Sequence, residues 1–196
     1  MSTAYISIGS NLGDRLEYTR EAIRKLKQSK GIEIRKASSV YETQSTEYKD
    51  QPWFLNMVLE FETLLEPLNL LELLLGIENQ MGRARPEGSS RRKGDRPQGT
   101  EFVRYGPRNI DLDLLLYDGL VINSDKLTLP HPRMHRRRFV LVPLAEIAPK
   151  VVHPSLKKSV EKLLEELKTD SAQTDGRLPA SEKNEFEVRL YSEKVF

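Results

Sequence analysis

Two aspartates stand two residues apart in a short apolar run. Asp111 and Asp113 alternate with Leu112 and Leu114. This alternation predicts a strand over residues 110–116 in which both carboxylates project from one face, with Cα atoms about 7 Å apart at a rise of about 3.4 Å per residue. Such a pair can hold Mg²⁺, which bridges protein carboxylates to the phosphate oxygens of a nucleotide. The alternative is a solvated face on which both aspartates pair with nearby arginines.

Basic charge is concentrated around this pair. Residues 83–138 contain 13 Lys or Arg against 7 Asp or Glu, a net charge of +6, whereas the rest of the chain has 18 against 22, a net charge of −4. This excess indicates an anionic ligand, either a nucleotide or a nucleic acid, and the alternative is a solvated basic surface.

Any phosphate would have to be held by side chains. The sequence contains neither a Gly-x-x-x-x-Gly-Lys-Ser/Thr loop nor a Gly-x-Gly-x-x-Gly motif, which are the familiar backbone cradles for phosphate. Guanidinium groups bind phosphate well because their paired N–H groups match its oxygens. The candidates are Arg83, Arg85, Arg108, Lys126, His131, Arg136, Arg137 and Arg138.

Zinc chemistry is disfavoured. The chain has no cysteine, so a thiolate site is excluded. His131 lies between Pro130 and Pro132, which prevent a helix there, so His131 and His135 do not form the i, i+4 pair of a zinc site. Without further context, His131 would be a residue of a surface turn.

Asn56 is the most informative polar residue outside the basic region. It lies among apolar residues on a strand predicted over residues 54–62. A buried amide needs a hydrogen-bonding partner, and a heteroaromatic ligand would supply one. Taken alone, Phe54 and Phe139 are expected to pack in the core.

The elements that must position these residues follow the order strand, helix, strand, strand, helix, strand. Strands are predicted at 4–8, 32–41, 54–62 and 110–116, and helices from Asp14, which can cap the first helix, to Gly31, and from Pro67 to Gly82. This order is that of a ferredoxin-like α+β fold, an antiparallel sheet with helices packed on it.

The remaining segments are less regular. They are a long loop at 83–104, a short strand pair within 121–129, helices at 139–147 and 156–167, a linker at 168–183 and an alternating tail at 186–191. The tail could add a strand to a sheet edge, in this chain or in a neighbour. We expect one domain over 1–167 and a C-terminal extension over 168–196.

Composition restricts the class of protein. The 196 residues are 38% apolar, enough for one compact domain, and no uncharged apolar run approaches the length that spans a bilayer. The first residues lack the basic and apolar regions of a secretory signal. We therefore expect a cytoplasmic protein without a membrane partner.

Six short segments form a recognisable series along the chain. They are Ile8-Gly-Ser-Asn-Leu-Gly13, Gln51-Pro-Trp-Phe-Leu-Asn56, Glu78-Asn-Gln-Met-Gly-Arg83, Gly106-Pro-Arg-Asn-Ile-Asp-Leu-Asp113, Leu129-Pro-His-Pro-Arg-Met134 and Arg137-Arg-Phe139. Together they resemble one enzyme family, the 6-hydroxymethyl-7,8-dihydropterin pyrophosphokinases of folate biosynthesis. The resemblance implies transfer of pyrophosphate from ATP to the pterin hydroxymethyl oxygen with release of AMP.

The resemblance also implies roles for individual positions. Asp111 and Asp113 would hold two Mg²⁺ ions, and both aspartates, Arg85 and Arg108 would be catalytic. The ATP-binding positions would be Glu78, Arg85, Arg108, Lys126, Thr128, His131 and Arg137. The pterin-binding positions would be Thr43, Phe54, Asn56, Tyr105 and Phe139, with the pterin stacked between the two phenylalanines.

The sequence departs from the family at three places. Tyr105 stands where the family usually has Trp, Lys126 stands where an Arg is common, and the loop after Arg85 is longer than usual. We expect the loop from Arg83 to Tyr105 to become ordered when both substrates are bound. The protein is expected to act as a monomer or homodimer.

Two other functions fit the same fold. An RNA-recognition module shares the element order, but its central strands carry aromatic residues for stacking, whereas the predicted central strand here carries Asp111 and Asp113, so no nucleic acid partner is expected. A catalytically idle scaffold is the third reading, and the intact aspartate pair with Arg108 argues against it.

Overall fold

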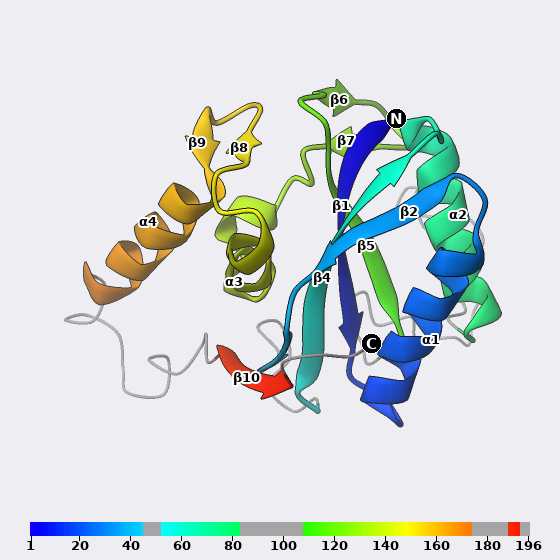
Figure 1. The fold of residues 1–196 in the computed structure, drawn as a ribbon. Coiled ribbons are helices and arrows are strands. Elements are labelled where there is room, and N and C mark those ends of the chain that lie inside the picture. Colours follow the sequence, from blue (N-terminus) through cyan, green and yellow to red (C-terminus); the bar gives the residue numbers. More distant parts are fainter. Residues whose placement is uncertain (45–51, 83–107, 174–187, 193–196) are drawn as a thin grey trace, which may run out of the picture.

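The computed structural model describes residues 1–44, 52–82, 108–173 and 188–192, which form a layered α+β structure. Figure 1 shows one sheet with α1 and α2 on one side and α3 and α4 on the other. The sheet consists of β1 (Ser2–Ser10), β2 (Ile32–Ala37), β3 (Val40–Thr43), β4 (Phe54–Thr63), β5 (Asp111–Tyr117) and β10 (Val188–Ser192). The helices are α1 (Arg15–Gln28), α2 (Pro67–Gln80), α3 (Arg138–Ile147) and α4 (Val160–Gln173).

The smaller elements lie beside this sheet. They are β6 (Ile122–Asn123) paired with β7 (Thr128–Leu129), a 3₁₀ turn at Met134–Arg136, and β8 (Val152–His153) paired with β9 (Lys158–Ser159). The predicted strand pair within 121–129 is thus confirmed. Among the described helices, none is long and apolar enough to cross a membrane.

The order of the main sheet is β10-β3-β4-β1-β5, with β2 also paired to β4, and each of these pairs of strands is antiparallel. The strands β1 and β4 lie at its centre and pair over their whole length, from Ser2 opposite Thr63 to Ser10 opposite Leu55. The expected α+β fold with an antiparallel sheet is confirmed.

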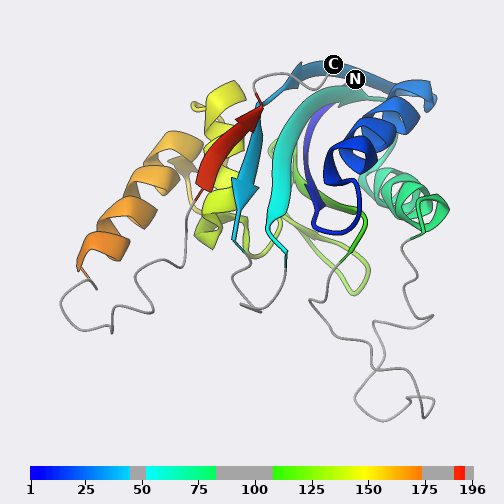
Figure 2. The same ribbon diagram turned by 90° about the horizontal axis from the view of Figure 1, so that it is seen from below.

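The alternation of side chains gives the sheet two apolar faces. Ile6 and Ile8 of β1 and Leu59 of β4 pack with α1 and α2 in one core, whereas Val58 and Leu115 pack with α3 and α4 in the other. Figure 2 shows the sheet from below with the two helical layers on either side of it. The residues with candidate functions on β4 and β5 project toward the side that carries α3.

The helix starts follow the sequence signals. The Asp14 side chain accepts a hydrogen bond of 3.0 Å from the backbone N–H of Glu17 and caps α1. Pro67 occupies the first turn of α2, where its missing N–H costs nothing. Gly31 and Gly82 follow the two helices with φ of 79° and 83°, a backbone conformation that favours glycine.

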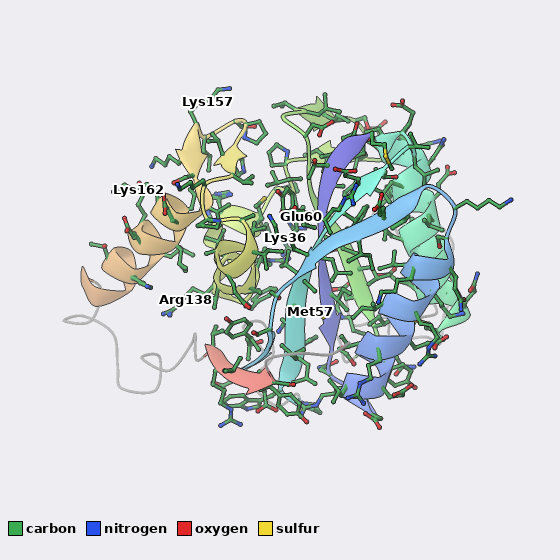
Figure 3. The ribbon with its side chains drawn as sticks, viewed as in Figure 1. Lys36, Met57, Glu60, Arg138, Lys157 and Lys162 are labelled. Carbon is green, nitrogen blue, oxygen red and sulfur yellow. The ribbon has the colours of Figure 1, made fainter. Side chains whose placement is uncertain are left out.

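Charged and polar side chains support the sheet face that carries α3. The Tyr5 hydroxyl donates to Glu60 Oε2 at 3.1 Å, and the Lys36 ammonium donates to the same oxygen at 3.0 Å. Figure 3 shows Lys36 and Glu60 beside one another near the middle of the sheet. Burial and the nearby Glu60 carboxylate raise the pKa of Tyr5, so its hydroxyl stays protonated and remains a donor.

Helix α3 is fixed to β3 through one glutamate. The Glu146 carboxylate accepts hydrogen bonds from the backbone N–H of Ser39 at 2.9 and 3.0 Å, from the Ser39 hydroxyl at 2.9 Å and from the Tyr41 hydroxyl at 3.0 Å. Burial, then the bond to Glu146, raise the pKa of Tyr41 to about 12. This contact sets the position of α3 relative to the sheet.

The predicted strand at 32–41 is divided into two. β2 ends at Ala37 and β3 begins at Val40, and both pair with β4. At the division, the Ser38 hydroxyl accepts from the backbone N–H of Val58 at 2.9 Å. A side-chain oxygen thus takes the place of a backbone carbonyl in the ladder.

The C-terminal third differs from the prediction in two ways. α4 begins at Val160 rather than at 156, because residues 152–159 form the β8–β9 hairpin, in which Lys157 has a φ of 56°. The helix then continues to Gln173, so residues 168–173 are helical rather than part of a linker. The boundary between a domain at 1–167 and an extension at 168–196 stays a prediction.

The tail forms an edge strand of this chain's own sheet. β10 pairs antiparallel with β3, with Val188 opposite Thr43 and Leu190 opposite Tyr41. The predicted strand is confirmed, and of the two alternatives the structure has the one within the chain. Residues 186–187 lie outside the described part.

Candidate active site

The two aspartates lie at the start of β5 and on one face. Asp111 and Asp113 are partly exposed and Leu112 between them is buried, as strand alternation requires. In the register of the sheet, Asp111 is opposite Gly9 and Asp113 is opposite Ser7 of the central strand β1.

Basic groups surround both carboxylates. Arg108 Nη1 donates to Asp111 Oδ2 at 2.7 Å. Arg137 Nη1 and His131 Nε2 lie 3.7 and 3.9 Å from Asp113 Oδ2. Residues from two separate segments, the one before β5 and the one before α3, therefore converge on the aspartate pair with the charge that a polyphosphate requires.

His131 is a neutral ring held in one orientation. Its backbone N–H donates to the Leu115 carbonyl at 2.9 Å, and its Nδ1 accepts from the backbone N–H of Arg133 at 3.2 Å. Burial, followed by the charges of Arg137 and Arg133, lowers the pKa of His131 to about 4. At neutral pH the proton therefore resides on Nε2, the nitrogen that faces Asp113.

His135 belongs to a different cluster. Its ring meets the ring of His153 edge-on, with centroids 6.0 Å apart, so it does not join His131. Within the described ranges, no group of three or more His, Asp or Glu side chains could hold a metal ion unaided. The aspartate pair still fits Mg²⁺, which binds through one or two carboxylates and completes its shell with water and substrate phosphate.

Glu78 holds the start of β5 from the side of the sheet that carries α2. It is fully buried on α2, and its Oε1 accepts a 2.7 Å hydrogen bond from the backbone N–H of Leu112, the residue between the two aspartates. This bond ties α2 to the start of β5. The role of Glu78 in binding ATP stays a prediction.

Asn56 and Thr43 form a buried polar pair on neighbouring strands. Asn56 Nδ2 donates to Thr43 Oγ1 at 2.6 Å, and the two residues are only 6% and 3% exposed. Phe54 shares the face of Asn56 on β4, and Phe139 at the start of α3 packs against the core on the same side of the sheet. The guanidinium of Arg137 lies 5.3 Å from the centre of the Phe139 ring. The stacking of a pterin between the phenylalanines stays a prediction.

Gly9 joins the two halves of the site, although no role for it was expected from the sequence. On β1 it is opposite Asn56 on one side and Asp111 on the other. A Cβ at this position would lie 3.2 Å from Asn56 Oδ1, 3.8 Å from the Asp111 Cβ and 4.0 Å from Phe54 Cδ1. The strand was predicted to end at residue 8, whereas β1 continues to Ser10. Gly9 therefore lies inside the strand, where a glycine is a signal of close approach, and the predicted end of the strand concealed that signal.

Asn11 is a second residue without an expected role. Its backbone N–H donates to the Arg108 carbonyl at 3.1 Å, and its side-chain Oδ1 accepts from the Arg108 backbone N–H at 2.7 Å. Its Nδ2 donates to the Pro52 carbonyl at 3.3 Å. It thus links the segment of Arg108 to the segment that precedes Phe54. No local pattern in the sequence identifies contacts between residues so far apart in the chain.

The other expected positions are more peripheral or lie elsewhere. Thr128 on β7 is partly exposed, and Lys126 is exposed in the turn between β6 and β7. Arg83, Arg85 and the rest of the 83–104 loop lie outside the described residues, and so does Tyr105. The expectation that the loop from Arg83 to Tyr105 becomes ordered when both substrates are bound therefore stays a prediction.

Replacing Gly9 by Ala tests the pterin site that the resemblance implies, because this change is expected to weaken pterin binding there. The added methyl would press on Asn56 Oδ1, which is held by its bond to Thr43 and cannot move without breaking it. We expect the KM for the pterin to rise about tenfold, within the usual effect of overpacking a buried site. The matched control is Gly76→Ala on α2, where a Cβ meets nothing within 4 Å. An unchanged KM in Gly9→Ala would contradict this account of Gly9.

Comparison with known proteins identifies the family. Residues 5–149 match the family model described as 7,8-dihydro-6-hydroxymethylpterin-pyrophosphokinase (HPPK). The chain belongs to the HPPK family. A Bacillus subtilis 2-amino-4-hydroxy-6-hydroxymethyldihydropteridine pyrophosphokinase is 46% identical over 148 residues, covering 76% of this chain and 79% of that protein. An Aquifex aeolicus protein of the same name is 38% identical over 161 residues, covering 82% and 89%.

Longer proteins carry an HPPK-like part. The Schizosaccharomyces pombe folic acid synthesis protein fol1 is 39% identical over 164 residues, 84% of this chain but only 20% of that protein. A Plasmodium falciparum HPPK-DHPS structure has a TM-score of 0.65 at 14% identity and covers 93% of this chain and 46% of that chain. This likeness supports the fold, and the chain spans less than half of that protein.

Proposed function

We propose that this HPPK-family chain transfers pyrophosphate from ATP to the hydroxymethyl group of 6-hydroxymethyl-7,8-dihydropterin and releases AMP, a step of folate biosynthesis. In this reaction the pterin hydroxyl oxygen forms a bond to the β phosphorus, the bond from that phosphorus to the α–β bridging oxygen breaks, and the hydroxyl proton is released. The observation that carries the proposal is the position of Gly9 between Asn56 on β4 and Asp111 on β5. The residue expected to bind the pterin and the residue expected to bind the metal are thus separated by a single glycine.

Asp111 and Asp113 are proposed to hold two Mg²⁺ ions together with the phosphates of ATP. When bound, the ions would neutralise the phosphate charge and orient the β phosphorus. The hard oxygen donors on one face of β5 support this assignment, because both carboxylates are accessible and close to basic side chains.

The basic groups around the pair are proposed to bind phosphate. Arg108 and Arg137 already lie beside carboxylates, and each can turn its guanidinium to phosphate oxygens when ATP arrives. His131 would donate one hydrogen bond from Nε2 without adding charge. Arg85, Lys126 and Thr128 are also proposed to contact the nucleotide.

The pterin is proposed to bind on the β4 side of Gly9. Asn56 offers its amide and Thr43 its backbone to the polar edge of the pterin, and Phe54, Phe139 and Tyr105 offer aromatic surfaces. Catalysis then consists mainly of holding the hydroxyl in line with the β phosphorus, since the protein forms no covalent bond with the phosphoryl group. A cytoplasmic location and a monomeric or homodimeric state stay predictions.

The test is product analysis. The full chain is mixed with ATP, Mg²⁺ and the reduced hydroxymethylpterin, and nucleotides are separated. We expect AMP and a pyrophosphorylated pterin in equal amounts, and no product when Mg²⁺ is chelated. Formation of ADP, or AMP release that does not depend on the pterin, would contradict the proposed reaction.

A further inference from the structure

The C-terminal strand β10 lies outside the segment that matches the family, yet it is built into the sheet beside the proposed pterin site. The family match ends at residue 149, whereas β10 covers residues 188–192. In the register, Val188 is opposite Thr43 and Arg189 is opposite Glu42. The strand that presents Thr43 to Asn56 is therefore held on its other edge by the tail.

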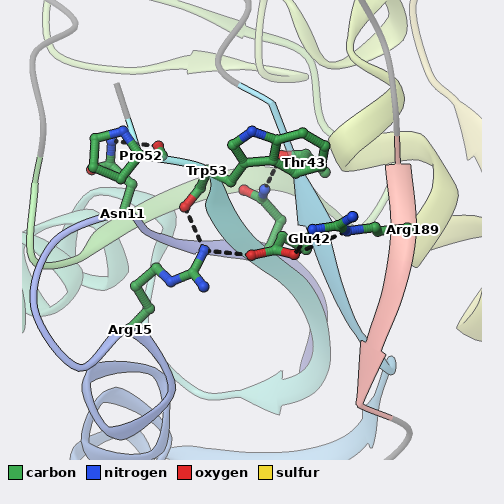
Figure 4. A network of polar contacts seen from close by, with 8 residues as sticks. Asn11, Arg15, Glu42, Thr43, Pro52, Trp53 and Arg189 are labelled. Carbon is green, nitrogen blue, oxygen red and sulfur yellow. Dashed lines mark hydrogen bonds and ion pairs between the residues drawn. The ribbon is translucent and has the colours of Figure 1, made fainter. Parts of the chain in front are cut away.

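Arg189 makes the strongest contacts of this strand. Its Nε and Nη2 donate to Glu42 Oε2 at 3.0 and 2.6 Å. Its guanidinium also lies over the Trp53 ring, 4.4 Å from the ring centre. A single side chain of the tail thus contacts both the strand β3 and the residue that precedes Phe54 (Figure 4).

A second arginine completes the arrangement. Arg15, at the start of α1, donates from Nη1 to Glu42 Oε1 at 2.8 Å and to the Trp53 carbonyl at 2.7 Å. Figure 4 shows Arg15 and Arg189 on either side of the Glu42 carboxylate. We call Arg15, Glu42, Trp53 and Arg189 the Glu42 clamp.

The clamp depends on a buried charge. Glu42 is 8% exposed. Burial alone would raise the pKa of Glu42, but the hydrogen bonds and charges of Arg189 and Arg15 outweigh it and hold the pKa below its ordinary value. The carboxylate is therefore ionised, and it would be undercompensated if either arginine were lost.

Open space lies beside the clamp, at the ends of β3 and β4. A cavity of about 470 Å³ is lined by Asn11, Leu12, Gly13, Arg15, Glu42, Pro52, Trp53 and Arg189. It lies on the face of the sheet opposite Asn56, because Glu42 and Trp53 alternate with Thr43 and Phe54. The clamp residues therefore line open space on this side of the ends of β3 and β4, where their contacts with one another hold them in place.

We propose that Arg189 is a positioning residue for the pterin: by holding Glu42 and Trp53, it sets the placement of their neighbours Thr43 and Phe54. The pterin role rests on the proposed function. The placement itself is a property of the fold and can be measured without turnover.

The test compares Arg189→Ala with Arg35→Ala in the full-length chain. Arg35 on β2 also pairs with a cross-strand glutamate, Glu62, at 2.6 Å, but at the opposite end of β4. We expect Arg189→Ala to raise the KM for the pterin about fivefold, the effect of losing one member of a coupled network, while the KM for ATP stays within about twofold. Arg189→Lys, which keeps the charge but not the two-nitrogen contact with Glu42, is expected to restore only part of the loss.

Hydrogen exchange provides the second readout. Amides of residues 40–43 and 54–56 are expected to exchange about tenfold faster in Arg189→Ala and to be unchanged in Arg35→Ala. The inference would be overturned by any of three results. These are equal rises in the two KM values of Arg189→Ala, a pterin KM no higher than in Arg35→Ala, and unchanged exchange at both segments. If the unaltered protein forms no AMP at all, the proposed function fails first and the pterin role of Arg189 is overturned with it.

Discussion

Asp111→Asn is expected to lower kcat by about 10³-fold, which corresponds to about 4 kcal/mol of transition-state stabilisation. The amide keeps the size of the carboxylate, but it removes the negative charge that would bind Mg²⁺ opposite the phosphates. The measurement is the initial rate of AMP formation at saturating ATP, Mg²⁺ and pterin.

The matched control for this change lies at the other end of the same strand. Asp118 follows β5 with a φ of 44°, and its Oδ1 accepts from the Thr3 N–H at 2.7 Å. Asn tolerates this backbone conformation and keeps an acceptor, so Asp118→Asn is expected to leave kcat within about twofold. Thermal unfolding of Asp111→Asn should stay close to that of the unaltered protein, because the relieved repulsion from Asp113 offsets the weaker bond from Arg108, which an amide oxygen can still accept. A normal rate in Asp111→Asn would exclude Asp111 as a metal ligand.

Asn56→Ala is expected to raise the KM for the pterin by about 10²-fold, because a site that hydrogen-bonds its ligand loses much of its affinity when that polar partner is removed. The KM for ATP should change by less than about threefold, since the phosphates are proposed to bind at β5. The measurement is a pair of saturation curves, one for each substrate.

Asn56→Ala also leaves the buried Thr43 hydroxyl without the hydrogen bond that Asn56 donates, so stability must be controlled. Thr63→Val removes a buried acceptor at the opposite end of β4, where Thr63 Oγ1 accepts from the Leu65 N–H at 3.0 Å. Both variants are expected to lose about 1–2 kcal/mol of unfolding free energy. Only Asn56→Ala should change the pterin KM, and an equal change in Thr63→Val would assign the effect to general loosening of the sheet.

Local patterns predicted the elements that depend on local interactions. The cap at Asp14, the proline at the start of α2 and the alternation along β4 all act within a few residues, and the structure has each of them. The division between β2 and β3 was missed, because it depends on the Ser38 hydroxyl binding a strand 20 residues away. The β8–β9 hairpin was missed because Leu156 lies four residues before Val160 and so continues the apolar spacing of α4 into a segment that is not helical.

The same distinction applies to the site. The alternation of side chains along a strand was enough to predict that Asp111 and Asp113 lie on one face. The meeting of Asn56 and Asp111 at Gly9 depends on the register of three strands, which no short segment specifies. Asn11 and the Glu42 clamp likewise join segments that are far apart in the chain, so their contacts could not be predicted from any local pattern.

Binding of a paramagnetic substitute for Mg²⁺ tests the central claim most directly. Mn²⁺ is titrated into the full-length chain with the pterin and an ATP analogue whose α–β bridge resists cleavage, and free Mn²⁺ is counted by electron paramagnetic resonance. The claim that Asp111 and Asp113 hold the metal predicts two bound ions per chain, and loss of both in the double variant Asp111→Asn, Asp113→Asn. Undiminished Mn²⁺ binding by that double variant would contradict it.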